Sequence, residues 1–136
     1  MDAHAPKAVL VLARERAMVE PILVELRRMS YVAVWMEACR PALDMIEGVR
    51  FALAIVAIEE PADWASCRRI VQAARCPVAV FTRLLAPDRR YRRKAFDMGV
   101  TAYVCPPCSR GCLRALLHRV RQGDSQIELT RGSLSA

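Results

Sequence analysis

Three of the chain's six cysteines fall within the stretch YVCPPCSRGC, residues 103–112. Cys105 and Cys108 form a CxxC pair, and Cys112 follows four residues later, on the same face of any helix that begins near Cys108. A thiol at the N-terminus of a helix can have a lowered pKa and react readily. The spacing therefore allows a redox pair, part of a metal site, or cysteines without a chemical role.

A metal site in this stretch lacks a ligand. Structural zinc is held by four side chains, and the three cysteines leave one to be supplied from elsewhere. His118 lies six residues after Cys112, on another side of the expected helix. We therefore expect no bound metal or other cofactor and favour cysteines without a chemical role. A redox- or metal-responsive switch that uses Cys105, Cys108 and Cys112 is kept as the alternative.

The composition predicts one globular domain. The chain has 136 residues, is 54% hydrophobic and carries a formal net charge of +7. This length allows one ordinary core, and the positive charge favours anionic partners. No apolar run approaches the ~20 residues that span a bilayer, and the N-terminus MDAHAPK is not a secretory signal. We expect a cytoplasmic protein with reduced thiols and no membrane contact.

Five short apolar runs recur at intervals of 20 to 26 residues, and each gap has helical spacing; the runs are AVLVL, YVAVW, FALAIVAI, PVAVF and AYV. Most are apolar on both faces, as strands covered on both sides are. The order predicts an α/β three-layer sandwich, a doubly wound (βα)5 fold with a five-stranded parallel sheet. Function is expected at the carboxyl ends of its strands. The domain should span residues 7–122, between an N-terminal arm (1–6) and a polar tail or linker (123–136).

Proline and glycine set the expected limits of two helices. Pro21 lies within an apolar stripe and is tolerated if its helix begins near Ala17 or Met18. Gly99 follows another helical stripe and is expected at its C-cap.

The segments PVAVFT (77–82) and AFDMGVTAYV (95–104), with Pro61 after the third run, resemble the receiver domain of bacterial two-component response regulators. The resemblance covers roughly residues 7–122. It implies the strand order 2-1-3-4-5 and places Thr82 and Tyr103 at the family's two switch positions.

The residues that carry the family's chemistry are replaced. In receivers an acidic pair after the first strand holds a divalent cation, an Asp ends the third strand, and a Lys follows the fifth. Here Ala13 and Arg14, Ala57, and Pro106 occupy those places. A methyl group cannot attack phosphorus, Ala13 offers no ligand, and Arg14 repels a cation. The resemblance therefore implies a degenerate pseudo-receiver without catalytic residues, which is not an enzyme.

Charged residues near the strand ends have two interpretations. Arg14 could replace the cation and pair with Glu59 or Glu15, which would hold the domain in one state. The alternative, which we favour, is that these charges point into water, since exposed ion pairs contribute only ~0–1 kcal/mol.

The segment APDRRYRRKAFDMG (86–99) predicts a strongly basic helix. A solvated face is the default interpretation of such a run. Receivers, however, use the face of the fourth helix, the fifth strand and the last helix for partner contacts. The resemblance therefore implies a phosphorylation-independent signalling module that binds an acidic protein or a second copy through this face. Binding to nucleic acid phosphates is a less favoured alternative. The expected contact residues are Arg89, Arg90, Tyr91, Arg93, Arg110 and Arg114.

Overall fold

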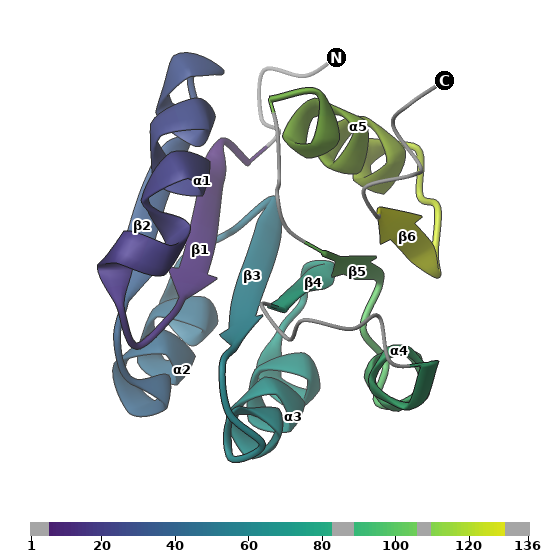
Figure 1. Ribbon diagram of the computed structural model, residues 1–136. Helices are drawn as coiled ribbons and strands as arrows, with labels where there is room; N and C mark the ends of the chain where they lie inside the picture. The colour runs from purple at the N-terminus through teal and green to yellow at the C-terminus, as the bar shows by residue number, and fades with distance from the viewer. Residues whose placement is uncertain (1–5, 83–88, 106–109, 130–136) are drawn as a thin grey trace.

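The computed structural model describes residues 6–82, 89–105 and 110–129, with only the backbone described for Arg89 and Arg110. Strands and helices alternate along the chain in the order β1 (Ala8–Leu12), α1 (Arg16–Arg28), β2 (Val32–Met36), α2 (Cys39–Gly48), β3 (Leu53–Ile58), α3 (Asp63–Ala73), β4 (Val78–Thr82), α4 (Arg89–Asp97), β5 (Ala102–Val104), α5 (Arg110–Arg121) and β6 (Ile127–Leu129). The predicted α/β sandwich is confirmed (Figure 1). None of the described helices is long and apolar enough to cross a membrane.

All strands of the sheet are parallel, in the order β2-β1-β3-β4-β5-β6. The predicted order of the first five is confirmed, but the prediction of a five-stranded sheet is wrong. The sixth strand comes from the segment expected to be a polar tail. The Ile127 amide donates to the Thr101 carbonyl at 2.8 Å, and the Cys105 amide donates to the Leu129 carbonyl at 3.0 Å. Ile127 and Leu129 are buried while Glu128 between them is not, an alternation too short to stand out in a polar context.

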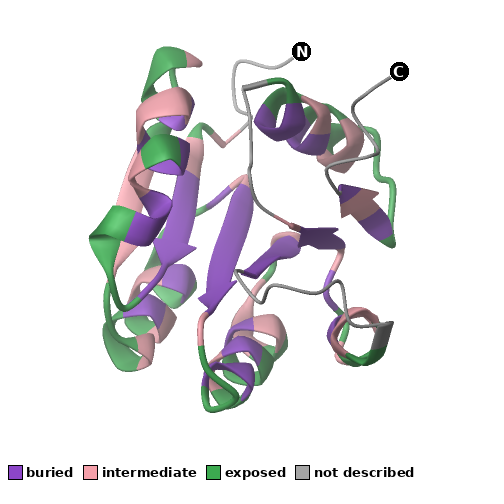
Figure 2. Cartoon of the chain, viewed as in Figure 1, coloured by how far each residue is buried: buried purple, intermediate pink, exposed green. Residues whose placement is uncertain are grey.

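Helices cover both faces of the sheet. In Figure 1, α1 and α5 lie on one face and α2, α3 and α4 lie on the other. Val9 and Val11 belong to the core on the α1–α5 side, and Leu10 and Leu12 belong to the opposite core. Every residue of β3 is buried, as the continuous apolar run predicted (Figure 2).

Two helix limits were predicted with different success. Helix α1 begins at Arg16, so Pro21 lies beyond the first turn rather than within it. Pro21 is exposed, where water can satisfy the carbonyl that loses its helical donor. Gly99 ends α4 as predicted, with a φ of 104° that favours glycine. A Cβ at Gly99 would also stand only 3.1 Å from Cγ1 of Val71, so α3 approaches closely there.

Candidate functional site

A pocket of about 250 Å³ opens at the carboxyl ends of β1 and β3. The chain leaves these neighbouring strands toward opposite faces of the sheet, which creates a crevice where the strand order reverses. Ala13, Arg14, Ala57 and Asp63 line this pocket, together with residues at the start of α2. It contains three of the positions at which the receiver resemblance places the phosphorylation chemistry, Ala13, Arg14 and Ala57.

Two of the alanines that line the pocket, Ala13 and Ala57, are held in place at the carboxyl ends of the strands. Ala57 is paired with Phe81 of β4 and is only 5% exposed. The Ala13 amide donates to the Met36 carbonyl at 3.0 Å, and its own carbonyl accepts from Nε1 of Trp35 at 2.9 Å. Neither position supplies a carboxylate to this crevice.

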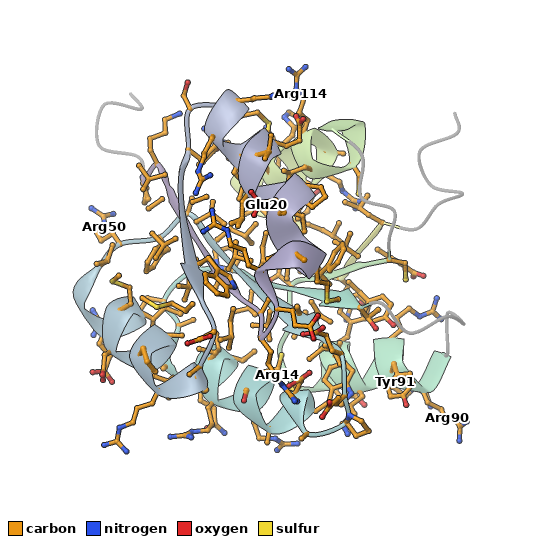
Figure 3. All side chains as sticks on the ribbon, turned by 60° about the vertical axis from the view of Figure 1, so that its left-hand side comes forward. Arg14, Glu20, Arg50, Arg90, Tyr91 and Arg114 are labelled. Atoms are coloured by element: carbon orange, nitrogen blue, oxygen red, sulfur yellow. The ribbon has the colours of Figure 1, made fainter. Side chains whose placement is uncertain are left out.

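Arg14 forms the main ion pairs of the pocket. Its Nε and Nη2 donate to Oδ1 of Asp63 at 3.0 and 2.5 Å, and its Nη1 donates to Oε2 of Glu60 at 3.0 Å. The hydrogen bond to Asp63, followed by that to Glu60, raises the pKa of the Arg14 guanidinium. Arg14 therefore pairs with acidic residues, as the less favoured interpretation held, but the partners proposed there, Glu59 and Glu15, were wrong. Figure 3 shows Arg14 at the lower end of the molecule, beside the teal helix α3.

Asp63, which the sequence analysis did not select, organises the loop between β3 and α3. It is the first residue of α3, and its Oδ2 accepts from the backbone amides of Glu59 at 2.8 Å and Glu60 at 2.9 Å. Both of its oxygens thus accept hydrogen bonds from the chain itself. A short acidic side chain in the first turn of a helix, just after a strand, was the available signal.

The surroundings of Glu59 disfavour its ionised form. Its pKa is raised, first by burial and then by the negative charges of Glu15 and Asp63. Arg14 and the backbone of Glu15 oppose this shift. Among the described residues, no donor reaches the buried Oε2 of Glu59.

The two switch-like residues lie inside the core. Thr82 ends β4 and Tyr103 lies in β5, and each is 1% exposed. Tyr103 belongs to the core on the α2–α4 side of the sheet.

The described cysteines do not form an activated cluster. Burial, followed by the charge of Glu128, raises the pKa of the half-buried Cys105, contrary to the expectation for a reactive thiolate. Cys112 is buried on α5, and Cys108 and Pro106 lie outside the described residues. Over residues 6–82, 89–105 and 110–129, no three His, Cys, Asp or Glu side chains are grouped to hold a metal ion.

The expected contact residues whose side chains the structure describes do not gather in one patch. Arg90 and Arg93 line a groove between α3 and α4, and Tyr91 turns toward α3, where its ring stacks on Trp64 with centroids 6.0 Å apart. Arg114 is exposed on α5. Figure 3 places Arg114 at the top of the molecule and Arg90 with Tyr91 at the lower right. The side chains of Arg89 and Arg110 lie outside the described part of the chain.

Strand β6 occupies the middle of the expected contact face. It covers the outer edge of β5, between α4 and α5 (Figure 1). Arg92 of α4 donates through Nη1 to both carboxylate oxygens of Glu128, at 3.0 and 2.9 Å, so an ion pair joins α4 to β6. This pair was not predicted, because the sequence indicated no strand at Glu128.

No protein-family model and no curated protein sequence matches the chain. Solved structures do match its fold. A two-component response regulator from Clostridium difficile aligns with a TM-score of 0.74 and 16% identity over 85% of this chain and 96% of its own. The signal receiver domain of an HD domain-containing protein from Pseudomonas fluorescens Pf-5 aligns with a TM-score of 0.72 and 18% identity, over 87% and 96%. For the chemotaxis protein CheY4 of Vibrio cholerae the values are 0.70 and 19%, over 85% and 99%. The chain therefore has the fold of response regulator receiver domains.

Proposed function

We propose that the protein is an atypical receiver-like module of a two-component or phosphorelay-type system that acts by protein contact, without phosphorylation. The observation that carries the proposal is the composition of the carboxyl-end pocket. A methyl group lies at Ala57, and the guanidinium of Arg14 lies where the receiver resemblance implies a ligand for a divalent cation.

Each replacement removes a separate requirement of phosphoryl transfer. Formation of an acyl phosphate needs a carboxylate oxygen as nucleophile, which Ala57 does not have. It also needs a divalent cation held by oxygen ligands to neutralise the developing charge. Arg14 already supplies a positive charge to Asp63 and Glu60, so it neutralises carboxylates that could attract such a cation. The residues of the pocket therefore favour a fixed ion pair over phosphoryl transfer.

The proposed contact side is the one formed by α4, β5 and α5, with β6 at its centre. Its cations include Arg90 and Arg93 of α4 and Arg114 of α5. A cationic side of this kind favours an acidic protein or an acidic face of a second copy, because complementary charge speeds encounter and suppresses wrong partners.

Incubation with acetyl phosphate and Mg²⁺, followed by intact mass measurement, tests the loss of phosphorylation. We expect no added phosphoryl group on the wild type, and none on Ala57→Asp, because Arg14 would pair with the new carboxylate. A receiver with an intact acidic pair, treated in parallel, is the positive control. A phosphoryl group on an aspartate of the wild type would refute the proposal.

A further inference from the structure

The basic residues of α4 are spread over two sides of the helix, and Arg90 and Arg93 line a pocket on each of them. Arg92 faces β6, where it pairs with Glu128. Arg90, Arg93 and Lys94 line a groove of about 420 Å³ between α3 and α4, as their spacing of three and four residues along one helical face allows. Arg68 of α3 lines the same groove. The cations thus come from both helices, and Asp97 is the one acidic residue among the groove's lining residues.

The cations of this groove differ from the paired arginines elsewhere. Arg14, Arg16, Arg28, Arg92 and Arg119 each form an ion pair with a carboxylate. Within the described part of the chain, no carboxylate pairs with Arg68, Arg93 or Lys94, and all three are exposed. The groove therefore has excess positive charge that is available to a ligand.

The two helices that form the groove are held in position. Trp64 of α3 and Tyr91 of α4 stack with an interplanar angle of 7°, and Nζ of Lys94 lies 5.4 Å from the centroid of the Trp64 ring. The ion pair between Arg92 and Glu128 holds the other side of α4. A groove fixed in this way requires little ordering when a ligand binds, which favours affinity.

We propose that the α3–α4 groove binds an acidic segment of a partner protein. The inference rests on the proposed function and extends the contact surface from the α4–β5–α5 side to the groove between α3 and α4, which shares Arg90 and Arg93 with that side. Guanidinium groups bind carboxylates through paired hydrogen bonds, and the groove supplies guanidinium groups from α3 and α4. A segment with several Asp or Glu residues would thus be bound from both sides.

The aromatic residues argue against single-stranded nucleic acid as the ligand. Such ligands gain much of their affinity when bases stack on open aromatic rings. Trp64 is only 3% exposed and contacts both Tyr91 and Lys94, and one face of the half-buried Tyr91 ring is turned to Trp64. None of the described residues that line the groove is aromatic, so the groove offers charge without a ring on which a base could stack.

Fluorescence anisotropy with a labelled peptide of about twelve alternating Glu and Ala residues tests the proposal. The test variant is Arg68→Glu/Arg93→Glu, and the matched control is Arg27→Glu/Arg40→Glu, which makes the same charge change at exposed positions on α1 and α2. We expect the test variant to bind at least about tenfold more weakly and the control to change less than about twofold, with binding that weakens as salt is added.

Equal losses in both variants would overturn the proposal, because they would show attraction to net charge rather than to the groove. Unchanged binding in the test variant would also overturn it. If an oligothymidine of similar length binds more tightly than the peptide and only the test variant loses it, the ligand is nucleic acid and the proposal is wrong.

Arg68→Gln/Arg93→Gln replaces the test variant if circular dichroism shows that the latter does not fold. The mass measurement after acetyl phosphate treatment does not depend on the groove, so failure of either proposal is recognised separately.

Discussion

Arginine has different surroundings at the carboxyl-end pocket and on helix α4. In the pocket, one guanidinium is surrounded by acids: Arg14 pairs with Asp63 and Glu60, and Asp63 in turn accepts two backbone amides. In the α3–α4 groove, the described Arg68, Arg93 and Lys94 have no carboxylate partner.

The difference shows that the basic residues behind the net charge of +7 do not all have the same role. A cation that is hydrogen-bonded to a mostly buried carboxylate stabilises one arrangement of the chain. A cation without a partner adds repulsion within the native state and remains available for binding. The guanidinium in the pocket is thus paired within the chain, whereas the described Arg68, Arg93 and Lys94 of the groove have no carboxylate partner.

The largest effect should follow from Asp63→Ala in the carboxyl-end pocket. The substitution removes the acceptor for two backbone amides and for Arg14, and the Asp63 side chain is only 11% exposed. We expect the free energy of unfolding to fall by about 2 kcal/mol, as is typical for hydrogen bonds to charged groups. Urea unfolding at neutral pH, with a check that the m-value is unchanged, measures this loss.

Glu60→Ala is the matched control for that experiment. The Glu60 side chain is 61% exposed and contacts the same guanidinium, so its loss should lower stability by less than about 0.5 kcal/mol. If the two substitutions lowered stability equally, the buried Asp63 carboxylate would contribute no more than an exposed ion pair. The pocket would then not differ from the surface of α4 in how its arginine is stabilised.

Much of the fold could be predicted from the sequence because the strands are covered on both sides. The continuous apolar runs and the helical stripes between them predicted the alternating elements, and the receiver resemblance implied the order of the first five strands. Strand β6 was missed because its three residues are stabilised by contacts distant in sequence. Ile127 is buried against the α1–α5 core, and Glu128 meets Arg92 of α4.

The site was less predictable because its charges are paired by tertiary contacts. The sequence indicated that Arg14 and Ala57 occupy receiver-type positions, but not that Asp63, which lies 49 positions after Arg14, would be the partner. Tyr91 was expected to contact a partner, yet it stacks on Trp64. Such choices depend on how the faces of helices are oriented, which a single sequence does not specify.

A smaller effect should come from Glu59→Gln, which tests how far Arg14 compensates the acidic side chains near Asp63. The pKa of Glu59 is raised in the folded protein above its ordinary value of 4.5, so ionisation disfavours the native state. This penalty is absent below the unfolded pKa, grows as the pH rises, and is full above the raised pKa. The neutral amide removes it, and we expect the variant to gain up to about 1 kcal/mol relative to the wild type between acidic and neutral pH.

Urea unfolding of both proteins from pH 4 to pH 7 measures this difference. Glu47→Gln, on the exposed side of α2, is the control and should show no comparable gain. A loss of stability for Glu59→Gln at neutral pH would mean that the ionised Glu59 carboxylate is needed as a hydrogen-bond acceptor. The negative charge of Glu59 would then not destabilise the native state.

The smallest expected effect comes from a comparison between an arginine that has a carboxylate partner and one that has none. Arg93→Gln removes one of several like charges that line the α3–α4 groove, so stability at low salt should rise by about 0.3 kcal/mol. Arg16→Gln breaks the 2.8 Å pair with Glu20, one helical turn away, and should lower stability by a similar amount. Added salt should diminish both changes, because both charges are exposed and screened.

Thermal unfolding at low and high salt measures the two changes. If Arg93→Gln lowered stability as Arg16→Gln does, Arg93 would have a partner in solution, and the groove would lack the excess charge that the binding of an acidic segment requires.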